Sequence, residues 1–302
     1  MDQIEKYNAV SRMQIYIADH LQDKISLKDL AQSAGYSPWH AERLFKELTG
    51  TTPFSYIRAL RLTKAALSMR DRQPSQKIVD VALDFVFDSH EGFTRAFTRQ
   101  FGLSPKRYQK NPEPLPLFMP HQVRDYYQYL HERSKTMSGN QTVKSVFVQV
   151  IERPERKAII KRGMRATHYF EYCEEVGCDV WGILTSIKEA LYEPAGFWLP
   201  EAWIKPGTSE YVQGVEVPVD YSGKIPEGFE LVTLPSCKMM VFQGEAFEDE
   251  QFGDAIGEVW ALIDRYDPKL YGFDWAPCEG PRFQLEPRGY RGYIEGRPVK
   301  TL

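Results

Sequence analysis

One pattern of residues occurs twice in the first 110 positions, and it constrains the fold more than any other feature of the sequence. The second copy follows the first by about 51 residues. The corresponding residues are Asp29 and Asp80, Leu30 and Val81, Ala31 and Ala82, Tyr36 and Phe87, Arg43 and Arg95, Phe45 and Phe97, Gly50 and Gly102, Pro53 and Pro105, Tyr56 and Tyr108. Such an internal repeat predicts two copies of one supersecondary unit.

Each copy has the start and stop signals of two consecutive helices. In the first copy, Ser26 with Asp29 three residues later is a capping-box start, and Gly35 is a left-handed stop. A longer helix opens at Pro38, where proline suits the first turn, and stops at Gly50. We therefore expect an all-α region in which a short helix, a tight turn and a longer helix occur twice, joined by a helix over residues 53–69.

A proline-rich segment divides the chain. Residues 111–121 read NPEPLPLFMPH, with four prolines in eleven positions, which cannot continue a helix and favours extended chain. At 302 residues the chain is long enough for two domains. We predict a head over residues 1–110, a linker with a short helix (residues 123–133) over residues 111–144, and a second domain over residues 145–302.

The net charge of −3 conceals a difference between these parts. Residues 1–110 carry 17 Lys and Arg against 12 Asp and Glu, a net charge of +5. The remainder carries 21 against 29, a net charge of −8. A basic head on an acidic body is the asymmetry expected when only the head meets phosphate groups.

The repeated unit is typical of a helix-turn-helix, whose second helix enters the major groove of DNA. Arginine can contact guanine or hold phosphate, and glutamate can accept a hydrogen bond from cytosine. Lys106 and Arg107 follow the second copy and are expected at phosphates, which position the protein without specifying sequence. The other candidates for contacts with double-stranded promoter DNA are Trp39, His40, Glu42, Arg43 and Lys46 in the first copy and His90, Glu91, Thr94, Arg95 and Arg99 in the second. The alternative is that these are solvated faces of ordinary helices.

The segments SLKDLAQSAGYSPWHAERLFKELTG and IVDVALDFVFDSHEGFTRAFTRQFGLSPKRY resemble the DNA-binding domain of the AraC/XylS family of transcription regulators. The resemblance covers roughly residues 11–110. It implies two recognition helices that enter successive major grooves on one face of an asymmetric site, on the order of 20 base pairs long. Glu42 and Glu91 stand where neutral amides are common in the multidrug-regulator branch, so the base preference of that branch does not transfer.

The second part alternates strand-like and helix-like stretches in an α+β pattern. The strand-like stretches are residues 146–150, 158–161, 211–217, 237–243 and 282–286, and the helix-like ones are 168–173, 180–191 and 250–266. The run EYVQGVEVPVDYSGKIPEGFELVTLPSCKMMVFQGEAF resembles the GyrI-like, or AraC effector-binding, domain over about residues 145–300. The resemblance implies a pseudo-twofold pair of sheet-helix units around an apolar pocket, in which an acidic residue offsets the charge of a cationic ligand.

Aromatic residues of the second part suit a planar or cationic ligand. The stretch GFWLPEAW reads as a loop or a sheet edge. The acids that the resemblance implies fall at Gln284 and Ile294 here, so Glu216 and Glu286 are the candidates instead, and a pocket without an acid would take a neutral ligand. The candidate ligand-binding residues are Tyr169, Trp181, Trp198, Trp203, Tyr211, Glu216, Phe273, Glu286 and Tyr290, and each could instead be a core or surface residue.

These features predict a transcription activator that is controlled by a small aromatic or lipophilic cationic effector and that has RNA polymerase as a partner. The alternatives are a hydrolase or a sequestering binder of toxic small molecules that carries a DNA-binding head. We expect no cofactor and no metal, because Cys173 and Cys178 lack zinc-site spacing and no catalytic fingerprint occurs. Without a signal peptide or an apolar stretch long enough to span a membrane, we expect a cytoplasmic protein that needs no membrane.

Overall fold

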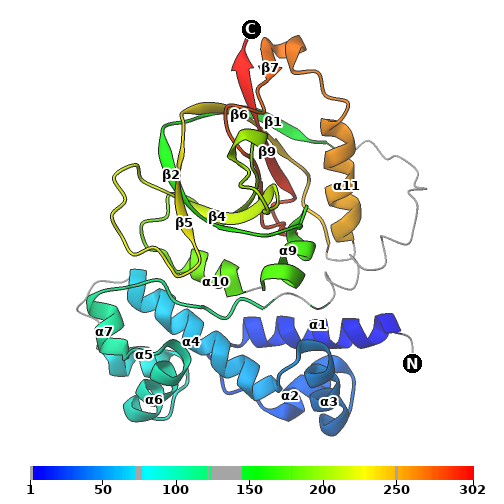
Figure 1. Cartoon of the computed structure of the whole chain (residues 1–302). Helices are drawn as coiled ribbons and strands as arrows, with labels where there is room; N and C mark the ends of the chain where they lie inside the picture. The colour runs from blue at the N-terminus through cyan, green and yellow to red at the C-terminus, as the bar shows by residue number, and fades with distance from the viewer. Residues whose placement is uncertain (1–2, 72–76, 121–122, 124–144, 178, 249–250) are drawn as a thin grey trace. The chain divides into compact units, whose positions relative to one another are not determined.

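The computed structural model describes residues 3–71, 77–120, 123, 145–177, 179–248 and 251–302. The chain divides into two compact units, residues 1–127 and 128–302 (Figure 1). The short helix expected over residues 123–133 lies, apart from Val123, outside the described residues.

The first unit is helical, as the repeat predicts. Its helices are α1 (Gln3–Asp19), α2 (Leu27–Ala34), α3 (Pro38–Thr49), α4 (Pro53–Asp71), α5 (Ile78–Asp84), α6 (His90–Phe101) and α7 (Pro105–Lys110). The pairs α2–α3 and α5–α6 are the two copies of the repeat, and each is followed by a helix that begins with proline.

Serine residues cap four of these helices. At the start of α2 the Ser26 hydroxyl accepts a hydrogen bond from Asp29 N–H, and the Asp29 carboxylate accepts one from Ser26 N–H, which completes the expected capping box. Ser37, Ser89 and Ser104 accept equivalent bonds at the starts of α3, α6 and α7. Each cap satisfies an otherwise unpaired N–H group, and α2 and α3 begin where the sequence predicts.

The turns inside the two repeats differ at one position. Gly35 ends α2 with φ 74°, in the left-handed region that glycine adopts without strain. The equivalent residue after α5 is Val86, which adopts φ 61°. A β-branched residue is strained there, and the backbone hydrogen bond from Phe87 N–H to the Ala82 carbonyl at 2.9 Å closes the same turn. The second turn is therefore imposed by its surroundings rather than by its residue.

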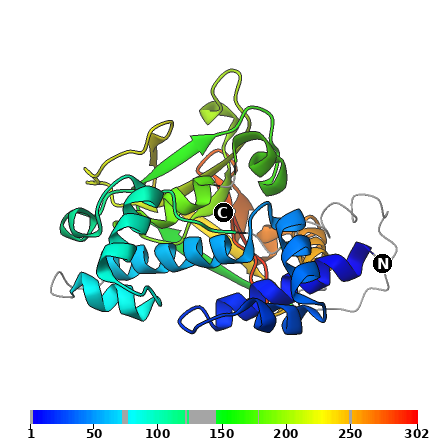
Figure 2. The same cartoon turned by 90° about the horizontal axis from the view of Figure 1, so that it is seen from below.

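The long helix α4 joins two separate cores. Its first half contributes Tyr56 and Ile57 to the core of the first repeat, and its second half contributes Leu62 and Met69 to the core of the second. Figures 1 and 2 show α4 running between the two groups of helices. Because both repeats pack on this one helix, α4 sets the position of α3 relative to α6.

The first residues of the proline-rich segment pack on the head. Leu115 and Leu117 are buried in the core of the second repeat, and Phe118 N–H donates to Thr63 Oγ1 of α4 at 2.8 Å. Val123 N–H also bonds to a side chain of α1. The expected linker therefore starts with chain that belongs structurally to the first unit.

The second unit is built on a nine-stranded sheet whose neighbouring strands are all antiparallel. The strand order is β1-β6-β9-β8-β3-β4-β2-β5, and β7 pairs with β9. The strands are β1 (Phe147–Arg153), β2 (Arg156–Arg162), β3 (Ala195–Trp198), β4 (Tyr211–Val217), β5 (Glu230–Leu234), β6 (Cys237–Gln243), β7 (Phe273–Trp275), β8 (Arg282–Leu285) and β9 (Ile294–Thr301). Helices α9 (Tyr169–Val176) and α10 (Asp179–Thr185) follow β2, and α11 (Phe252–Ile263) follows β6; the short 3-10 helices are η1 (Glu201–Trp203) and η3 (Pro268–Tyr271).

The structure confirms part of the expected α+β pattern and corrects the rest. The strands expected over residues 211–217 and 237–243 have the predicted bounds. The stretch GFWLPEAW was expected to be a loop or an edge, but its first half is the central strand β3. That prediction was wrong because β3 is buried and short, so it shows little alternation. The helix expected over residues 180–191 ends at Thr185, and β5, β7 and β9 were not predicted.

The sheet consists of two halves with the same pairing. In the first half β2 pairs with β4, with Ile159 opposite Val215, and in the second β6 pairs with β9, with Met240 opposite Arg297. Met240 lies 81 positions after Ile159, and Arg297 lies 82 positions after Val215. The same two shifts relate every other residue pair of β2–β4 to a pair of β6–β9. Strands β3 and β8 meet at the centre of the sheet, where the two halves join.

One row of residues crosses this centre. Gln213 of β4 lies opposite Gly196 of β3, Gly196 opposite Gln284 of β8, and Gln284 opposite Glu295 of β9. Residues directly opposite one another project from the same face of a sheet. On this face α9 and α10 pack against the first half of the sheet. The row continues from Glu295 to Phe242 of β6, and α11 packs against Phe242 in the second half. The row is therefore on the helix-covered face.

Candidate DNA interface and ligand site

The outer side of α3 carries most of the first set of candidate DNA contacts. Arg43 and Lys46 are exposed, and Trp39 is 69% exposed, which is unusual for a tryptophan. The Arg43 guanidinium lies 5.0 Å from the centre of the Trp39 ring. His40 and Glu42 are half-buried. This helix therefore presents an aromatic and cationic surface whose side chains are not engaged in the core.

Helix α6 presents the equivalent surface of the second copy. His90, Glu91, Arg95 and Arg99 are exposed, and Thr94 is half-buried. Phenylalanines on the opposite side of α6 are buried in the second core: Phe93, Phe97 and Phe101. The helix is thus anchored by its apolar side and leaves its polar side to solvent.

Most of the cations on this surface have no internal partner. Among the described residues, the side chains of Lys46, Arg95, Arg99 and Lys106 form no hydrogen bond and no ion pair. Arg107, whose side chain is 72% exposed, lies 3.5 Å from Glu113 and so has one internal partner. Unpaired exposed cations on consecutive helix-turn-helix units are the arrangement that binding to phosphates and base edges requires.

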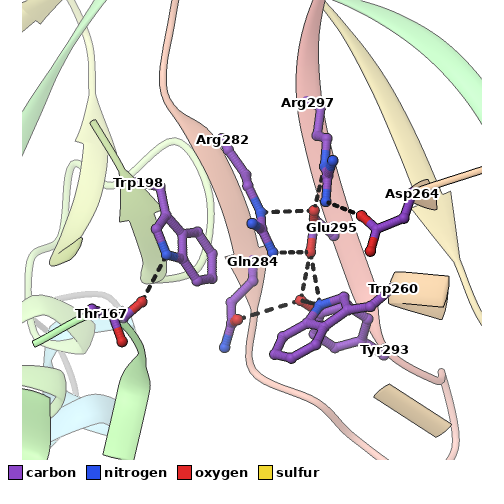
Figure 3. Close-up of polar contacts among 9 residues, drawn as sticks. All are labelled: Thr167, Trp198, Trp260, Asp264, Arg282, Gln284, Tyr293, Glu295 and Arg297. Atoms are coloured by element: carbon purple, nitrogen blue, oxygen red, sulfur yellow. Dashed lines mark hydrogen bonds and ion pairs between the residues drawn. The ribbon is translucent and has the colours of Figure 1, made fainter. Parts of the chain in front are cut away.

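A buried carboxylate lies at the centre of the second unit (Figure 3). Glu295 of β9 is fully buried, and both of its oxygens are engaged. Its Oε1 lies 2.7 Å from Arg282 Nε and 2.8 Å from Arg297 Nε. Its Oε2 accepts hydrogen bonds from Arg282 Nη2 at 2.7 Å, Trp260 Nε1 at 3.0 Å and the Tyr293 hydroxyl at 2.8 Å. The burial of this charge is therefore compensated by cations and by hydrogen-bond donors.

The Arg282 guanidinium lies between two tryptophans. Its central carbon is 4.0 Å from the centre of the Trp198 ring and 6.0 Å from that of Trp260 (Figure 3). The Trp198 indole donates to the Thr167 carbonyl at 2.8 Å, which sets the orientation of the ring. The Arg282 side chain is 28% exposed, so this group lies between the buried carboxylate and solvent.

The equivalent residues of the other half lack such partners. Tyr211 and Gln213 of β4 correspond to Tyr293 and Glu295, and both are fully buried. Neither the Tyr211 hydroxyl nor the Gln213 amide has a hydrogen-bond partner among the described residues. The Tyr211 hydroxyl lies over Gly196, where an added Cβ would come within 2.2 Å of it. Burial raises the pKa of both phenols well above the usual value, and Glu295 adds to this effect at Tyr293. Both phenols therefore remain neutral hydrogen-bond donors.

The structure brings some of the expected ligand-binding residues together. Trp198 packs against Tyr211, with ring centres 4.9 Å apart, beside Arg282. Tyr169 and Trp181, on α9 and α10, pack against each other with ring centres 6.0 Å apart. Trp203 of η1 instead lines a depression formed also by Ile160, Arg162, Leu199, Val232 and Thr233.

The remaining candidates have other surroundings. Glu216 and Gln213 project from different faces of β4. On the Glu216 face, Arg153 and Arg156 each lie 3.0 Å from the Glu216 carboxylate. Tyr290 is exposed and Glu286 is half-buried, and both contact Arg288. Phe273 of β7 packs in the core beneath α11. None of these four residues hydrogen-bonds to Glu295 within the described part of the chain.

Sequence reasoning missed the acid of this cluster by one position. It assigned the acid near the C-terminus to Ile294, but the buried carboxylate belongs to Glu295. The sequence does contain a signal for Glu295. Tyr211 and Gln213 are two residues apart, and the similar pair Tyr293 and Glu295 recurs 82 positions later. This single match between two three-residue segments is too short to be noticed without the strand pairing that relates them.

The described part of the chain offers neither a cluster of metal ligands nor a membrane-spanning helix. Within the described residues, no three or more His, Cys, Asp or Glu side chains gather as metal ligands would, and Cys178 lies outside them. The described helices include none whose length and apolar character would suffice to cross a membrane.

A family model and several known proteins match parts of this chain. The helix-turn-helix domain family matches residues 30–111. The Right origin-binding protein of Escherichia coli strain K12 is 44% identical over 99 residues, which are 33% of this chain and 34% of that protein. The HTH-type transcriptional activator AarP of Providencia stuartii is 33% identical over 100 residues, 33% of this chain and 73% of AarP. A solved transcriptional regulator from Chromobacterium violaceum, described as of AraC-type, is 26% identical over 35% of this chain and 95% of its own, with a TM-score of 0.32. The match spans about a third of the length of the Right origin-binding protein.

Proposed function

This chain belongs to the AraC-type family of helix-turn-helix transcription regulators, and we propose that it is an activator controlled by a small molecule bound in its second unit. DNA-binding regulation of transcription is the function of the family. The control by an effector, the activation and the partnership with RNA polymerase are the further content of the proposal. A regulator of promoters acts where the DNA is, so we also propose a cytoplasmic location.

One observation carries the DNA-binding part of the proposal. Two recognition helices, α3 and α6, pack on the same helix α4 and expose unpaired cations. Their orientation relative to each other is therefore set before DNA is met, which lowers the entropy lost on binding. We propose that α3 and α6 enter successive major grooves and that Lys106 and Arg107 hold phosphates.

Selection of bound duplexes from a random pool tests this. We expect an asymmetric site with two contacted segments about one helical turn apart, on the order of 10 base pairs. Affinity for the selected duplex should fall steeply as salt rises, because each phosphate contact releases counterions. Equal affinity for selected and scrambled duplexes at every salt concentration would contradict sequence-specific binding.

The organisation of the second unit supports its assignment as an effector-binding, GyrI-like domain. Two equivalent half-sheets meet at β3 and β8, and their helices cover one face. Near that junction Trp198, Trp260 and Arg282 surround a buried carboxylate (Figure 3). A few convergent polar groups among aromatic side chains are typical of small-molecule sites.

Transcription in vitro from the selected site tests the coupling. Purified RNA polymerase and the full chain should give more transcript than polymerase alone, and an effector should change that amount. A chain that binds its DNA site but leaves transcript levels unchanged would not be an activator. A compound that saturates the second unit without changing DNA affinity or transcription would support the sequestering alternative.

The hydrolase alternative receives less support from the geometry. A general base needs a lone pair within reach of the water it activates. Glu295 Oε1 accepts from Arg297 and lies 2.7 Å from Arg282 Nε, and Oε2 accepts from Arg282, Trp260 and Tyr293. Incubation of a bound compound with the chain, followed by chromatography, distinguishes the two functions: an effector is recovered intact, and a substrate is consumed.

A further inference from the structure

We propose that Arg282 is an internal ligand: its guanidinium fills a cation-binding site formed by Trp198, Trp260 and Glu295, and thereby closes that site to organic cations from solution. The inference rests on the proposed role of the second unit in binding small molecules. It reverses the expectation of a cationic effector, because the cation at this site belongs to the chain itself.

The surroundings of Arg282 have the chemistry of a cation site. Aromatic faces attract a cation through the negative potential of the ring, and the attraction is stronger where water is excluded. The guanidinium carbon of Arg282 lies 4.0 Å from the ring centre of Trp198 and 6.0 Å from that of Trp260. Two guanidinium nitrogens of Arg282 each lie 2.7 Å from an oxygen of the fully buried Glu295. Any planar organic cation would be held by the same two contacts, ring faces and a carboxylate.

The site does not depend on Arg282 for its shape. Trp198 is held by its hydrogen bond to the Thr167 carbonyl, and Trp260 by bonds to the Tyr293 hydroxyl at 2.9 Å and to Glu295 at 3.0 Å. Figure 3 shows these contacts, and we therefore expect both rings and the carboxylate to stay in place when the guanidinium is removed.

The charge balance of the site also opposes a second cation. Arg297 lies 2.8 Å from Glu295 Oε1, so one buried carboxylate already meets two guanidinium groups. Asp264, 3.8 Å from Arg297, is mostly exposed and contributes little. A further cation would have to displace Arg282, which competes as a tethered group at an effective concentration in the millimolar range or above.

Complementation of the missing guanidinium tests the proposal. Calorimetric titration of the full-length chain with methylguanidinium and with benzamidinium should show no saturable binding to the wild type. Arg282→Ala should bind both, and the aromatic benzamidinium should bind more tightly, by about 10-fold. The double variant Arg282→Ala with Glu295→Gln should lose most of this binding, because the carboxylate charge is gone.

Two further variants make the outcome decisive. Arg282→Gln also lacks the cation but can donate to Glu295, so it keeps a partner for the carboxylate if Arg282→Ala does not fold. Arg291→Ala is the matched control, since Arg291 is another partly buried arginine paired with a carboxylate, Glu193, but among the described residues it stacks on no tryptophan.

The proposal is overturned if folded Arg282→Ala or Arg282→Gln binds neither cation. It is also overturned if the wild type binds them equally well, or if Arg291→Ala gains the same affinity. These titrations contain no DNA, so their failure contradicts the assignment of Arg282 alone. Failure of the proposed function would appear instead as unchanged transcription.

Discussion

Gln213 and Glu295 occupy equivalent positions in the two halves of the second unit, yet only Glu295 has its hydrogen-bonding capacity satisfied. Both lie in the same cross-strand row, on either side of Gly196 and Gln284, and both are fully buried. Glu295 meets two arginines, a tryptophan and a tyrosine, whereas the Gln213 amide has no partner among the described residues. The two halves thus share a backbone but differ in polarity at their common centre.

This difference predicts opposite effects of one substitution. A buried polar group without a partner is unfavourable, so Gln213→Met should leave the free energy of unfolding unchanged or raise it, by up to about 2 kcal/mol. Glu295→Met, the matched variant, leaves two arginines without their carboxylate and should lower it by about 3–5 kcal/mol. Urea denaturation of both variants measures these values. A large loss of stability in Gln213→Met would mean that the amide has a bound partner.

Tyr56 and Tyr108 are equivalent residues of the two repeats with different hydroxyl environments. The Gln14 amide donates to the Tyr56 hydroxyl at 3.1 Å, whereas the Tyr108 hydroxyl has no partner among the described residues. Tyr56→Phe should therefore lower the free energy of unfolding by about 1 kcal/mol, and Tyr108→Phe should not lower it. Equal losses in urea denaturation at neutral pH would contradict this.

The same two tyrosines predict a loss of stability at alkaline pH. Burial raises the pKa of each to about 12, whereas a tyrosine in an unfolded chain titrates near 10. Above pH 10 the unfolded state loses these protons first, so stability is present in full below pH 10 and declines as the pH approaches 12. The midpoint of urea denaturation should fall over this range, and it should fall less in the variant with both tyrosines replaced by phenylalanine.

The strained turn at Val86 predicts an asymmetry between the repeats. Val86→Gly removes a left-handed valine, which costs roughly 1–2 kcal/mol, but adds flexibility to the unfolded chain. We expect a net gain of about 0.5–1 kcal/mol in the free energy of unfolding. Gly35→Val should lower it by about 1–2 kcal/mol, although nothing lies within 4 Å of the added Cβ, because the penalty comes from the backbone. Thermal denaturation compares the two, and a less stable Val86→Gly would refute the strain.

Arg43 and Arg95 predict how specificity is divided between the repeats. If each reads a base, its replacement by alanine should weaken binding to the selected duplex by roughly 1–3 kcal/mol and spare scrambled DNA. If the arginine instead holds a phosphate, its replacement should weaken binding to the selected and the scrambled duplex alike, and the affinity should depend less steeply on salt. Arg265→Ala removes one exposed charge from the second unit and serves as the control, since it should change neither affinity nor salt dependence. Fluorescence anisotropy with labelled duplexes measures all three.

Local signals in the sequence account for most of what could be predicted. The capping box at Ser26 and Asp29, the glycine stop at Gly35 and the repeated phenylalanines depend on neighbours within one or two helical turns, so they are readable without a fold. By contrast, the sequence predicts a loop or a sheet edge where β3 lies, because a short buried strand without alternation has no local signature.

The sequence by itself determined the repeated helix-turn-helix units, their exposed basic residues and the change of character after the proline-rich segment. Only the tertiary structure decided that Val86 adopts a left-handed conformation, that Glu216 is bound to arginines on the other face of the sheet, and that Glu295 is the carboxylate held against Arg282. The reason is that helix caps and helix faces arise from residues close in sequence. Which residue of a strand is buried, and against what, depends on pairings between strands that lie far apart in the chain.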